Sequence, residues 1–463
     1  TNYPEYIDTD IDININNNNA QFNSLNGKIA NNSIKFFETK IDLADKKKII
    51  NVEGIIEGPV NSIVEALNNS PLYEDTKSFT NQLIATGNGS LGLKMIFSAD
   101  APDDIDFTAK YDFLNATLQN QRIGLPKVDN FNASLIVDRD KYEILNGSAT
   151  FFSMPINVNL SKENNNTKIT VVGYLDEEFF TNNLGSNWKD KITGSSPWKA
   201  EANINEDTDT LIITSDLKGL KIDGPEPFKK DKDQIKLTSL IKKPSKNGST
   251  NFVLTMDNSI NGKIKINDQN NISGQINILS KEPFSDRNGL SIFANMKKID
   301  LNDFKKLFEN DSSKNKIFFS ESKINFEEIK VGGIILNRLE TQISPSKKGL
   351  KLSLYSNELK GNVLYNYEDN LLVGRFNKLI INNKNKYGQT QDKNEFQDPI
   401  KPFKIDIKFD EFILDEKSYG SLNLLAEGQN QNWLINNFTL TNPYHTLSAD
   451  GNWQNKDGVD KTS

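Results

Sequence analysis

The sequence predicts an all-β protein whose strands form a long, strongly twisted, mostly antiparallel sheet with a few short capping helices. Three observations carry this prediction. Apolar residues recur at every second position, turn residues separate the alternating segments, and helical patterns are few and short. Alternation with a period of two is typical of a strand with one apolar face and one solvated face. A sheet with many strands is expected to coil instead of remaining flat.

The alternating segments assign particular side chains to the apolar face. The run at 91–97 is the clearest, and similar runs occur at 350–354 and 403–409. Turn signals such as 346–349 and 368–370 separate runs of this kind, which favours a meander. Ten side chains are therefore expected on the apolar faces of their strands: Leu91, Leu93, Met95, Phe97, Ile264, Ile276, Leu352, Leu354, Ile405 and Ile407.

A short motif recurs in which a glycine stands between polar residues that are flanked by apolar ones. The copies are irregularly spaced, so the chain is not a strict solenoid. They are centred on Gly27, Gly147, Gly262, Gly274, Gly361 and Gly451. With a period of two, each glycine shares a face with its apolar neighbours. Such a glycine marks either a bulge that bends the sheet or close approach of a ligand or another backbone, and both interpretations suit a curved trough.

Three segments have a short helical pattern. They lie near 59–68, 176–184 and 300–308, and each places a few apolar residues on one side. The first has a proline at its start, and the third begins at an aspartate suited to capping a helix. These helices are expected to cover ends or edges of the sheet, where unpaired strands need protection.

The remaining organisation follows from where the alternation stops. A continuous β-segment is expected over 1–381, and a closing β-module over 402–453. Between them, 382–401 is polar and nearly without pattern, which predicts a flexible loop. The last residues, 454–463, are expected to form a disordered tail.

Composition limits the classes of function. Of the 463 residues, 36% are hydrophobic, which is low for a compact body of this length and favours an elongated one. The net charge is −7 without a basic stripe, so nucleic acid is not an expected partner. The chain has no cysteine, and His445 is its one histidine. We therefore expect neither a thiol or histidine catalyst nor a metal or cofactor.

No run of 18 apolar residues is present, so no membrane-spanning helix is expected in this chain. The sequence begins at Thr1, without a methionine or a signal peptide. It is interpreted as a piece of a longer protein, with any membrane anchor outside it.

Two short motifs resemble binding sites but lack the required context. The segment 87–92 matches G-x-G-x-x-G, yet an alternating strand follows it where a dinucleotide site needs a helix. The aspartates of 8–12 resemble the start of a calcium loop, but Ile13 stands where glycine is needed and Asn19 where glutamate is needed. The solvated face of a strand accounts for these aspartates.

Acidic pairs at 103–104, 177–178 and 327–328 could in principle support hydrolysis, but nothing in the sequence brings two of them together. The four tryptophans could line a sugar-binding surface, although packing in a core or at an edge is more common. They are Trp188, Trp198, Trp433 and Trp453. We therefore predict no enzymatic activity.

A family resemblance rests on the order of several weak motifs. The segments 194–200 and 211–220 contain G-x-x-x-W and S-D-L-x-G, and the turn 225–229 together with Lys230 reads P-x-P-x-x-K. This order resembles a block of the YhdP branch of the AsmA-like proteins. Further on, 299–304 is similar to an LDLxxW-type segment of that branch, with Phe304 in place of tryptophan.

The end of the chain is similar to the closing module of the same branch. The carriers of this similarity are 412–414, 419–422, 433–435 and an A-x-G-x-W step at 449–453, and the Pro71-Leu72 step also fits. The resemblance covers roughly residues 5–453, but it includes neither the anchoring helix nor the N-terminal part of the family. None of the matched residues is catalytic in the family.

The resemblance implies a bridge-like lipid transfer protein of the bacterial envelope, anchored in the inner membrane and crossing the periplasm. Its sheet would be rolled into an open apolar groove that conducts phospholipids to the outer membrane. The ten side chains assigned to the apolar face would then line this groove. The implied partners are phospholipid acyl chains and, through regions outside this chain, both membrane surfaces, and a monomer is expected.

Two other functions are compatible with an alternating all-β chain. One is a structural or adhesive array of β-sandwiches, in which the apolar faces pack against each other and no lipid binds. That array predicts separable domains of about 100 residues, but no Pro- or Gly-rich linkers occur at such intervals. The other is an all-β carbohydrate-active enzyme, which would need two carboxylates facing each other in a cleft.

Overall fold

The protein is all-β, as its sequence predicts. The computed structural model describes residues 6–29, 31–44, 46–69, 73, 80, 83–120, 125–138, 141–163, 166–184, 186–205, 209–245, 248–301, 318–331, 334–382, 400–430, 432–456 and 459–462. Strands account for 72% of the structure and helices for 6%, and the 30 strands belong to one open sheet that does not close into a barrel. Two compact units divide the chain, and each is described by itself.

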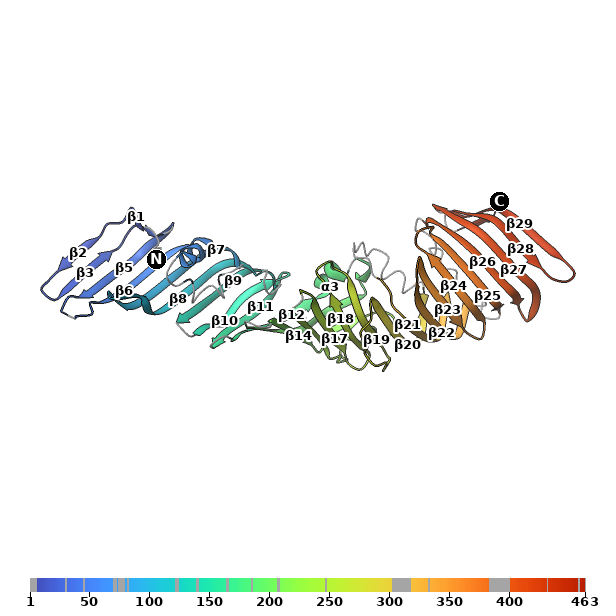
Figure 1. The fold of residues 1–463 in the computed structure, drawn as a ribbon, viewed down its shortest axis with the longest axis horizontal. Helices are drawn as coiled ribbons and strands as arrows, with labels where there is room; N and C mark the ends of the chain where they lie inside the picture. Colours follow the sequence, from blue (N-terminus) through green and yellow to red (C-terminus); the bar gives the residue numbers. More distant parts are fainter. Residues whose placement is uncertain are drawn as a thin grey trace. The chain divides into compact units, whose positions relative to one another are not determined.

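Unit 1 comprises Thr1–Asn183, Thr193–Leu220 and Lys232–Lys246. Its strands are β1 (Tyr6–Ile7), β2 (Asp12–Ile15), β3 (Asn19–Ser24), β4 (Lys28–Ile29), β5 (Asn32–Asp42), β6 (Ile49–Pro59), β7 (Leu83–Ser98), β8 (Ala101–Asn120), β9 (Leu125–Asp138), β10 (Lys141–Phe151), β11 (Met154–Glu163), β12 (Asn166–Asp176), β13 (Ile192–Ile204), β14 (Asp209–Ser215) and β16 (Thr238–Pro244). From β5 to β14 each strand pairs antiparallel with the next (Figure 1). Strand β15 (Leu220–Ile222) is shared between the units.

Unit 2 comprises Leu184–Ile192, Lys221–Asp231 and Asn247–Ser463. Its strands are β17 (Thr250–Met256), β18 (Ile260–Ile266), β19 (Ile272–Ile278), β20 (Leu290–Asp300), β21 (Ser322–Val331), β22 (Ile334–Ser346), β23 (Gly349–Tyr355), β24 (Leu359–Asn366), β25 (Leu371–Ile381), β26 (Ile400–Leu414), β27 (Lys417–Asn430), β28 (Asn432–Thr441), β29 (Thr446–Lys456) and β30 (Val459–Thr462), and it holds a short 3-10 helix at Ser186–Trp188. Consecutive strands again pair with each other, mostly antiparallel.

Three strand pairs of unit 2 run parallel: β19–β20, β20–β21 and β25–β26. A parallel pair cannot be joined by a tight turn, because the chain must return to the starting end of the sheet. Each pair is accordingly joined by a connection of eleven or more residues. The polar segment after Ile381 is one such connection.

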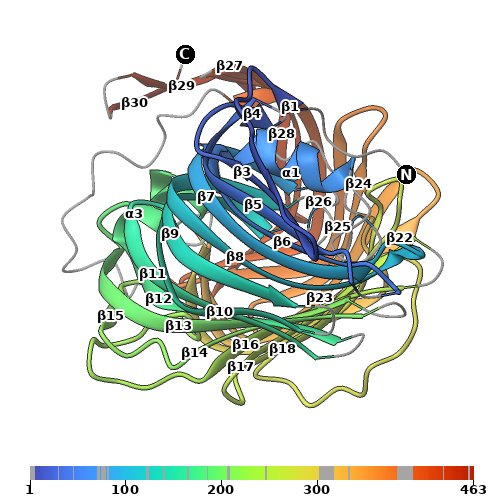
Figure 2. The same ribbon diagram turned by 90° about the vertical axis from the view of Figure 1, so that its left-hand side faces the viewer.

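Two α-helices occur in the described part of the chain, at the places where the sequence indicates them. Helix α1 (Val60–Asn68) starts directly after Pro59, which occupies its N-cap, and α3 (Glu177–Leu184) follows β12. Helix α1 packs on β6 and β7 and lies within the curve of the unit 1 strands (Figure 2). The third expected helix, at 300–308, falls almost wholly outside the described residues, and its first residue Asp300 ends strand β20.

Two expectations about the C-terminal region need correction or limitation. Most of the expected loop at 382–401 lies outside the described residues, but its end belongs to a strand, because β26 begins at Ile400. The expected disordered tail at 454–463 is wrong for the described residues. Strand β29 continues to Lys456 and pairs antiparallel with β30, so that backbone hydrogen bonds order this polar segment without an apolar pattern. The boundary of the compact units also differs from the expected division, since it falls between residues 184 and 247.

Candidate functional site

One face of the sheet in unit 1 carries an unbroken cross-strand row of apolar side chains. Residues that are paired in register point to the same face, so the row can be followed from strand to strand. Each of the strands β5 to β14 contributes one residue, and we call this row the first ladder. Its members are Ile34, Ile56, Leu91, Tyr111, Leu135, Ile144, Leu160, Ile169, Ala202 and Leu211.

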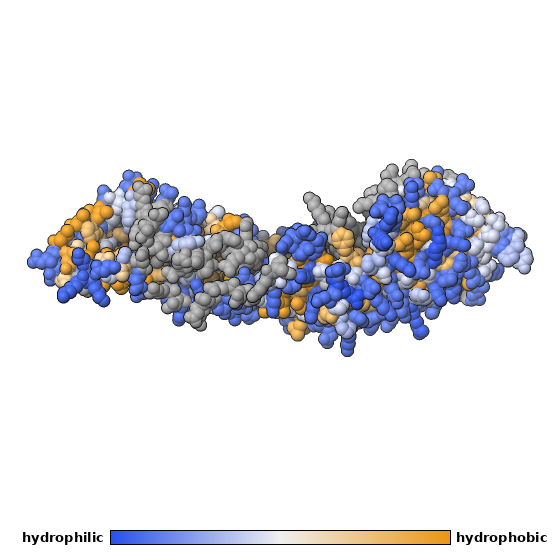
Figure 3. Space-filling view, viewed as in Figure 1, coloured by the Kyte–Doolittle hydropathy of each residue, from blue (hydrophilic) through white to orange (hydrophobic). Residues whose placement is uncertain are grey.

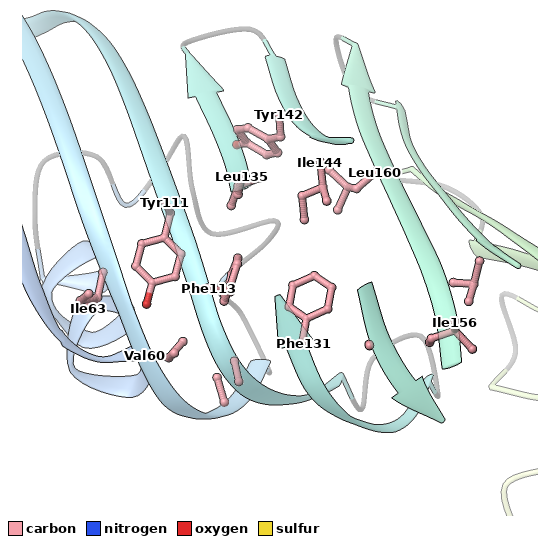
Figure 4. Close-up of a cluster of buried hydrophobic side chains, with 14 of the residues drawn as sticks. Val60, Ile63, Tyr111, Phe113, Phe131, Leu135, Tyr142, Ile144, Ile156 and Leu160 are labelled. Atoms are coloured by element: carbon pink, nitrogen blue, oxygen red, sulfur yellow. The ribbon is translucent and has the colours of Figure 1, made fainter. Parts of the chain in front are cut away.

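The first ladder is largely buried, and we call the face that carries it the inner face. Leu135 is 4% exposed and Ile144 3%. Phe113 and Phe131 flank the ladder on neighbouring strands, with ring centroids 5.2 Å apart (Figure 4). Val60 and Ile63 of α1 pack against the same cluster, so the helix covers part of the inner face. In the described part of unit 1, a helix partly closes the apolar face, and no second sheet packs on it.

A small pocket with a cavity volume of about 50 Å³, open to solvent on one side, lies between α1 and the inner face of β7 to β10. Among the described residues, its lining is apolar apart from three side chains, Thr80, Tyr111 and Tyr142, and none of these described lining residues is charged. Thr80 donates a hydrogen bond of 2.7 Å to Asn68 Oδ1, and the Tyr142 hydroxyl accepts one of 3.3 Å from Lys162 Nζ. The remaining polar atom, the Tyr111 hydroxyl, is buried without a hydrogen-bond partner in the described part of the chain.

Burial also changes the chemistry of Tyr111. The residue is 7% exposed, and desolvation raises the pKa of its phenol above the ordinary value of 10.0, so the hydroxyl stays protonated. Gly89 lies beside it, because a Cβ on Gly89 would come within 2.0 Å of the Tyr111 hydroxyl oxygen. The glycine therefore leaves the space that this hydroxyl occupies.

Unit 2 carries a second row of the same kind, which we call the second ladder. It crosses every strand from β17 to β29, and only one of its members is polar, Thr341. Its members are Met256, Ile260, Ile278, Ala294, Ile324, Thr341, Leu354, Gly361, Phe376, Phe409, Leu422, Leu440 and Leu447.

The second ladder is less covered than the first. From β23 onward, Leu354, Phe409, Leu422 and Leu440 are half-buried and Leu447 is 58% exposed. Figure 3 shows hydrophobic surface over β24 to β26 with hydrophilic margins beside it. In the described part of unit 2, no α-helix packs on these strands. This part of the sheet therefore presents an apolar surface that solvent can reach.

One glycine of the recurring motif, Gly361, belongs to the second ladder, where it makes room for a neighbouring ring at a register shift. A register shift lies between Lys360 and Gly361, and a Cβ on Gly361 would meet the Phe376 ring at 2.5 Å. Phe376 in turn stacks on Phe409 with ring centroids 4.8 Å apart. Gly147 also stands at a register shift, next to Ile144. At these two positions both interpretations of the motif apply, since the bulge coincides with close approach of a neighbouring group.

The opposite face of the unit 2 strands is polar. The register that builds the second ladder pairs a polar row one residue away from it: Gln342, Ser353, Asn362, Arg375, Lys408, Asn423, Thr439 and Ser448. Within this row Arg375 binds Asp406 through two hydrogen bonds of 2.9 and 2.7 Å, which raise the pKa of the guanidinium. The two faces of one sheet thus differ sharply in polarity, as alternation with a period of two requires.

We also call the face of unit 2 that carries the second ladder its inner face, and the ten candidate side chains lie on the inner faces of the two units. In unit 1, Leu91 belongs to the first ladder, and Leu93, Met95 and Phe97 follow it on the same face of β7, half-buried. In unit 2, Leu354 belongs to the second ladder. Five others share its face on neighbouring strands and are half-buried: Ile264, Ile276, Leu352, Ile405 and Ile407.

The motifs that resemble binding sites have ordinary structural roles. The glycines of 87–92 lie within strand β7, and strand β8 follows, so no helix N-terminus is available for a phosphate. Glu177 and Glu178 form the first turn of α3. The described residues contain no group of three or more acidic or histidine side chains that could hold a metal ion.

A comparison of the sequence with models of protein families identifies the family of this chain. The model of the YhdP protein family matches residues 3–463, which is nearly the whole chain. The chain belongs to the YhdP family. The match agrees with the resemblance found in the sequence, and it extends beyond the range over which motifs could be recognised. No curated protein and no solved structure shows significant similarity to this YhdP-family chain.

Sequence reasoning missed two features of the YhdP-family sheet. The first is that α1 packs on the inner face, although it was expected at an end or edge. Its apolar side chains Val60, Ile63 and Ala66 gave the available signal, because a helix with one buried stripe needs an apolar partner. The second is Tyr111, which no alternation pattern distinguishes from its neighbours.

The helices in the described part of the chain are too short and too polar to span a membrane.

Proposed function

We propose that this chain conducts phospholipids along the inner face of its sheet, as the periplasmic part of a protein anchored in the inner membrane, and that it catalyses no reaction. The lipids would pass to the outer membrane, and the chain would act as a monomer. One observation carries the proposal: within each unit, the ladder continues in register across ten or more strands, and among the described residues no second sheet covers it. The YhdP family match supports the proposal.

The energetics of lipid transfer explain why such a surface is sufficient. Exposing one methylene group to water costs about 0.8 kcal/mol, so exposing two tails of about sixteen carbons costs on the order of 25 kcal/mol. An apolar ladder removes most of this cost at every step along the sheet. Because the head group stays in water at the open side, no residue specific for it is required.

The ladders are also long compared with a bound lipid. Neighbouring strands lie about 4.8 Å apart, so the first ladder extends roughly 43 Å along the sheet and the second roughly 58 Å. Either distance is greater than one acyl chain needs. A lipid could therefore move along a ladder by exchanging one set of apolar contacts for the next, without leaving the apolar surface.

The test is a charge placed on the inner face of the full-length protein. Met95→Asp and Leu352→Asp each put a carboxylate beside a ladder at a half-buried position. We expect both variants to remain folded and to reduce phospholipid transfer to the outer membrane by at least about tenfold, because an unpaired charge in an apolar path costs more than 1.4 kcal/mol. Transfer would be followed with labelled phospholipid after separation of the two membranes.

The matched control is Ser353→Asp, which places the same charge on the adjacent residue of β23 but on the polar face. It is expected to transfer lipid at the rate of the unmodified protein. Normal transfer by both inner-face variants, or equal loss in the control, would contradict the proposal. Lipid extracted from the gently purified protein and identified by mass spectrometry would establish which lipid is carried.

A further inference from the structure

Helix α1 lies on the path that the first ladder offers to a lipid. Its side chains Val60 and Ile63 are buried in the same cluster as the ladder residues of β7 to β10. Two of these ladder residues, Leu91 and Leu135, line the small cavity between the helix and the strands. A lipid that moves along the first ladder therefore has to pass the place that α1 occupies. In the described part of unit 2, no α-helix packs on the strands of the second ladder from β23 onward.

The contacts that hold α1 on the strands are apolar. Val60, Ile63 and Ala66 are each at most 8% exposed. Among the polar side chains of the helix, only that of Asn68 has a hydrogen-bond partner in the described part of the chain, and this partner, Thr80, is not in a strand. Apolar contacts have no fixed direction. An acyl chain can therefore make the contacts with the strands that these helix side chains now make.

The helix has little stability of its own. It is nine residues long, and Pro59 at its N-cap makes no side-chain capping hydrogen bond. Its first turn has no acidic residue, and its last turn has no basic one. A helix this short is marginal in water without caps or favourable charges at its ends. Packing on the inner face is therefore what keeps α1 in place.

The fit between α1 and the strands is incomplete in two respects. A cavity of about 50 Å³ separates part of the helix from the strands, so the side chains that line it make no contact across it. The Tyr111 hydroxyl points towards Val60 and Ile63 (Figure 4) and is buried without a hydrogen-bond partner in the described part of the chain. Both features lower the stability of the covered state. Moving α1 away removes both, because water then reaches the hydroxyl.

We propose that α1 is a displaceable cover of the first ladder: the acyl chains of a phospholipid move it off the inner face of unit 1 and take over its apolar contacts. This inference rests on the proposed function and adds control of lipid entry to it. Unit 1 holds a lipid on this part of its ladder only when the helix has moved. The accessible part of the second ladder binds lipid without such a step, so it should be occupied at lower lipid concentration.

The first test ties α1 to the sheet in the full-length protein. This chain has no cysteine of its own, so Val64→Cys and Ala109→Cys introduce one pair, at half-buried positions of α1 and β8 that line the same cavity. A short bismaleimide then joins them. The probe is a vesicle of phosphatidylcholine with a photoactivatable diazirine in one acyl chain, and mass spectrometry locates its adducts on peptides. We expect the tether to lower adducts on β6 to β8 at least about fivefold and to leave those on β24 to β28 unchanged.

The reference is the same cysteine variant without the bismaleimide. The matched control is Lys94→Cys with Thr108→Cys, joined by the same reagent. These two residues are paired between β7 and β8 on the outer face, and Thr108 is the neighbour of Ala109. This crosslink joins two strands without touching α1, and it should leave the adducts in both units at the level of the reference.

Hydrogen exchange of α1 provides a second measurement. A ligand that binds beside an intact helix slows the exchange of its amides, whereas a ligand that displaces the helix speeds it. We expect phosphatidylcholine vesicles to speed exchange of the α1 amides at least about tenfold. Ile63→Ala, which removes a buried contact of the helix, should raise adducts on β6 to β8 at least about twofold. Glu65→Gln, on the exposed side of the same helix, should change neither result.

Equal adducts on β6 to β8 with and without the tether would overturn the cover and leave the proposed function standing. Slower exchange of α1 in the presence of lipid would do the same, and so would adducts confined to unit 2 in the untethered protein, because α1 would then be a permanent part of the core. An absence of adducts from both units of the untethered protein would contradict the proposed function and the cover together.

Discussion

The two ladders have the same in-register arrangement of apolar residues but differ in how many of these side chains are buried. In unit 1, seven of the ten ladder residues are buried, and α1 lies on the inner face. In unit 2, the ladder residues after β22 are half-buried or exposed, apart from Gly361 and Phe376. The same alternation of apolar and polar residues thus produces either a packed core or an accessible surface. Whether the apolar face becomes a core or an accessible surface depends on which other elements pack on it. The alternation of apolar and polar residues does not predict those elements.

Aromatic residues add to the difference. In unit 1, Phe113 contacts Tyr111 of the same strand β8 and Phe131 of the neighbouring strand β9, in both cases edge to face. The second ladder has one comparable pair, Phe376 stacked on Phe409, and glycines at 361 and 374 leave room for the Phe376 ring. Large rings close the surface in unit 1, whereas in unit 2 the Phe376 ring is buried beside the two glycines and the ladder residues Leu354, Phe409 and Leu422 stay half-buried.

The largest expected effect is the loss of stability caused by a charged residue on the inner face of each unit. Leu135→Asp puts a carboxylate at a position that is 4% exposed, between Tyr111 and Ile144 in the first ladder. We expect a loss of more than about 4 kcal/mol in unit 1, because the charge is buried without a partner. Leu352→Asp, at a half-buried position of unit 2, should cost about 1–2 kcal/mol. Hydrogen exchange of the strands would measure each unit separately.

The control for this comparison is Ile136→Asp. Ile136 is the neighbour of Leu135 in β9, lies on the outer face and is 49% exposed. The Ile136→Asp substitution should cause little loss of amide protection from hydrogen exchange in either unit. If Leu135→Asp and Leu352→Asp lower protection equally, the difference in cover between the two ladders has no energetic consequence, and the comparison fails.

A smaller effect is expected at alkaline pH, where the buried phenol of unit 1 resists ionisation. The pKa of Tyr111 is raised in the folded protein, so the unfolded chain releases the proton first, near pH 10. The contribution of Tyr111 to stability is therefore complete below pH 10 and decreases as the pH rises above it, by at most about 1.4 kcal/mol per pH unit. Burial also raises the pKa of Tyr6, to about 12, so part of the loss should remain in any Tyr111 variant.

Tyr111→Phe should make unit 1 less sensitive to pH between 10 and 11, measured by hydrogen exchange or circular dichroism, while unit 2 serves as the internal reference. An unchanged pH profile would show that this phenol is not buried in solution, and that α1 does not cover the inner face as described.

The alternation in the sequence predicted the orientation of side chains well. Leu91, Met95, Leu352 and Ile407 all lie on the expected face, because the period of two is a local property of each strand. The all-β class and the positions of α1 and α3 follow from equally local signals. Turn residues and helix-start patterns act within a few positions of themselves, so no tertiary information is required to read them.

Features that depend on distant contacts could not be read in the same way. The pairing of β25 with β26 is parallel, and its only trace in the sequence is the long polar connection after Ile381, which resembles any flexible loop. The docking of α1 on the inner face depends on the curve made by β7 to β9. The residues after Trp453, which pair the end of β29 with β30, include only one apolar residue, Val459, so their backbone pairing leaves no apolar pattern.

The most direct test of the account is photo-crosslinking along the second ladder in the intact protein. A photoreactive phenylalanine would replace Leu354 or Leu422 on the inner face, and Ser353 or Asn423 on the outer face of the same strands. The account predicts phospholipid adducts, identified by mass spectrometry, at the two ladder positions and none at their outer neighbours. Adducts of equal yield on both faces, or an absence of lipid adducts at the ladder positions, would contradict it.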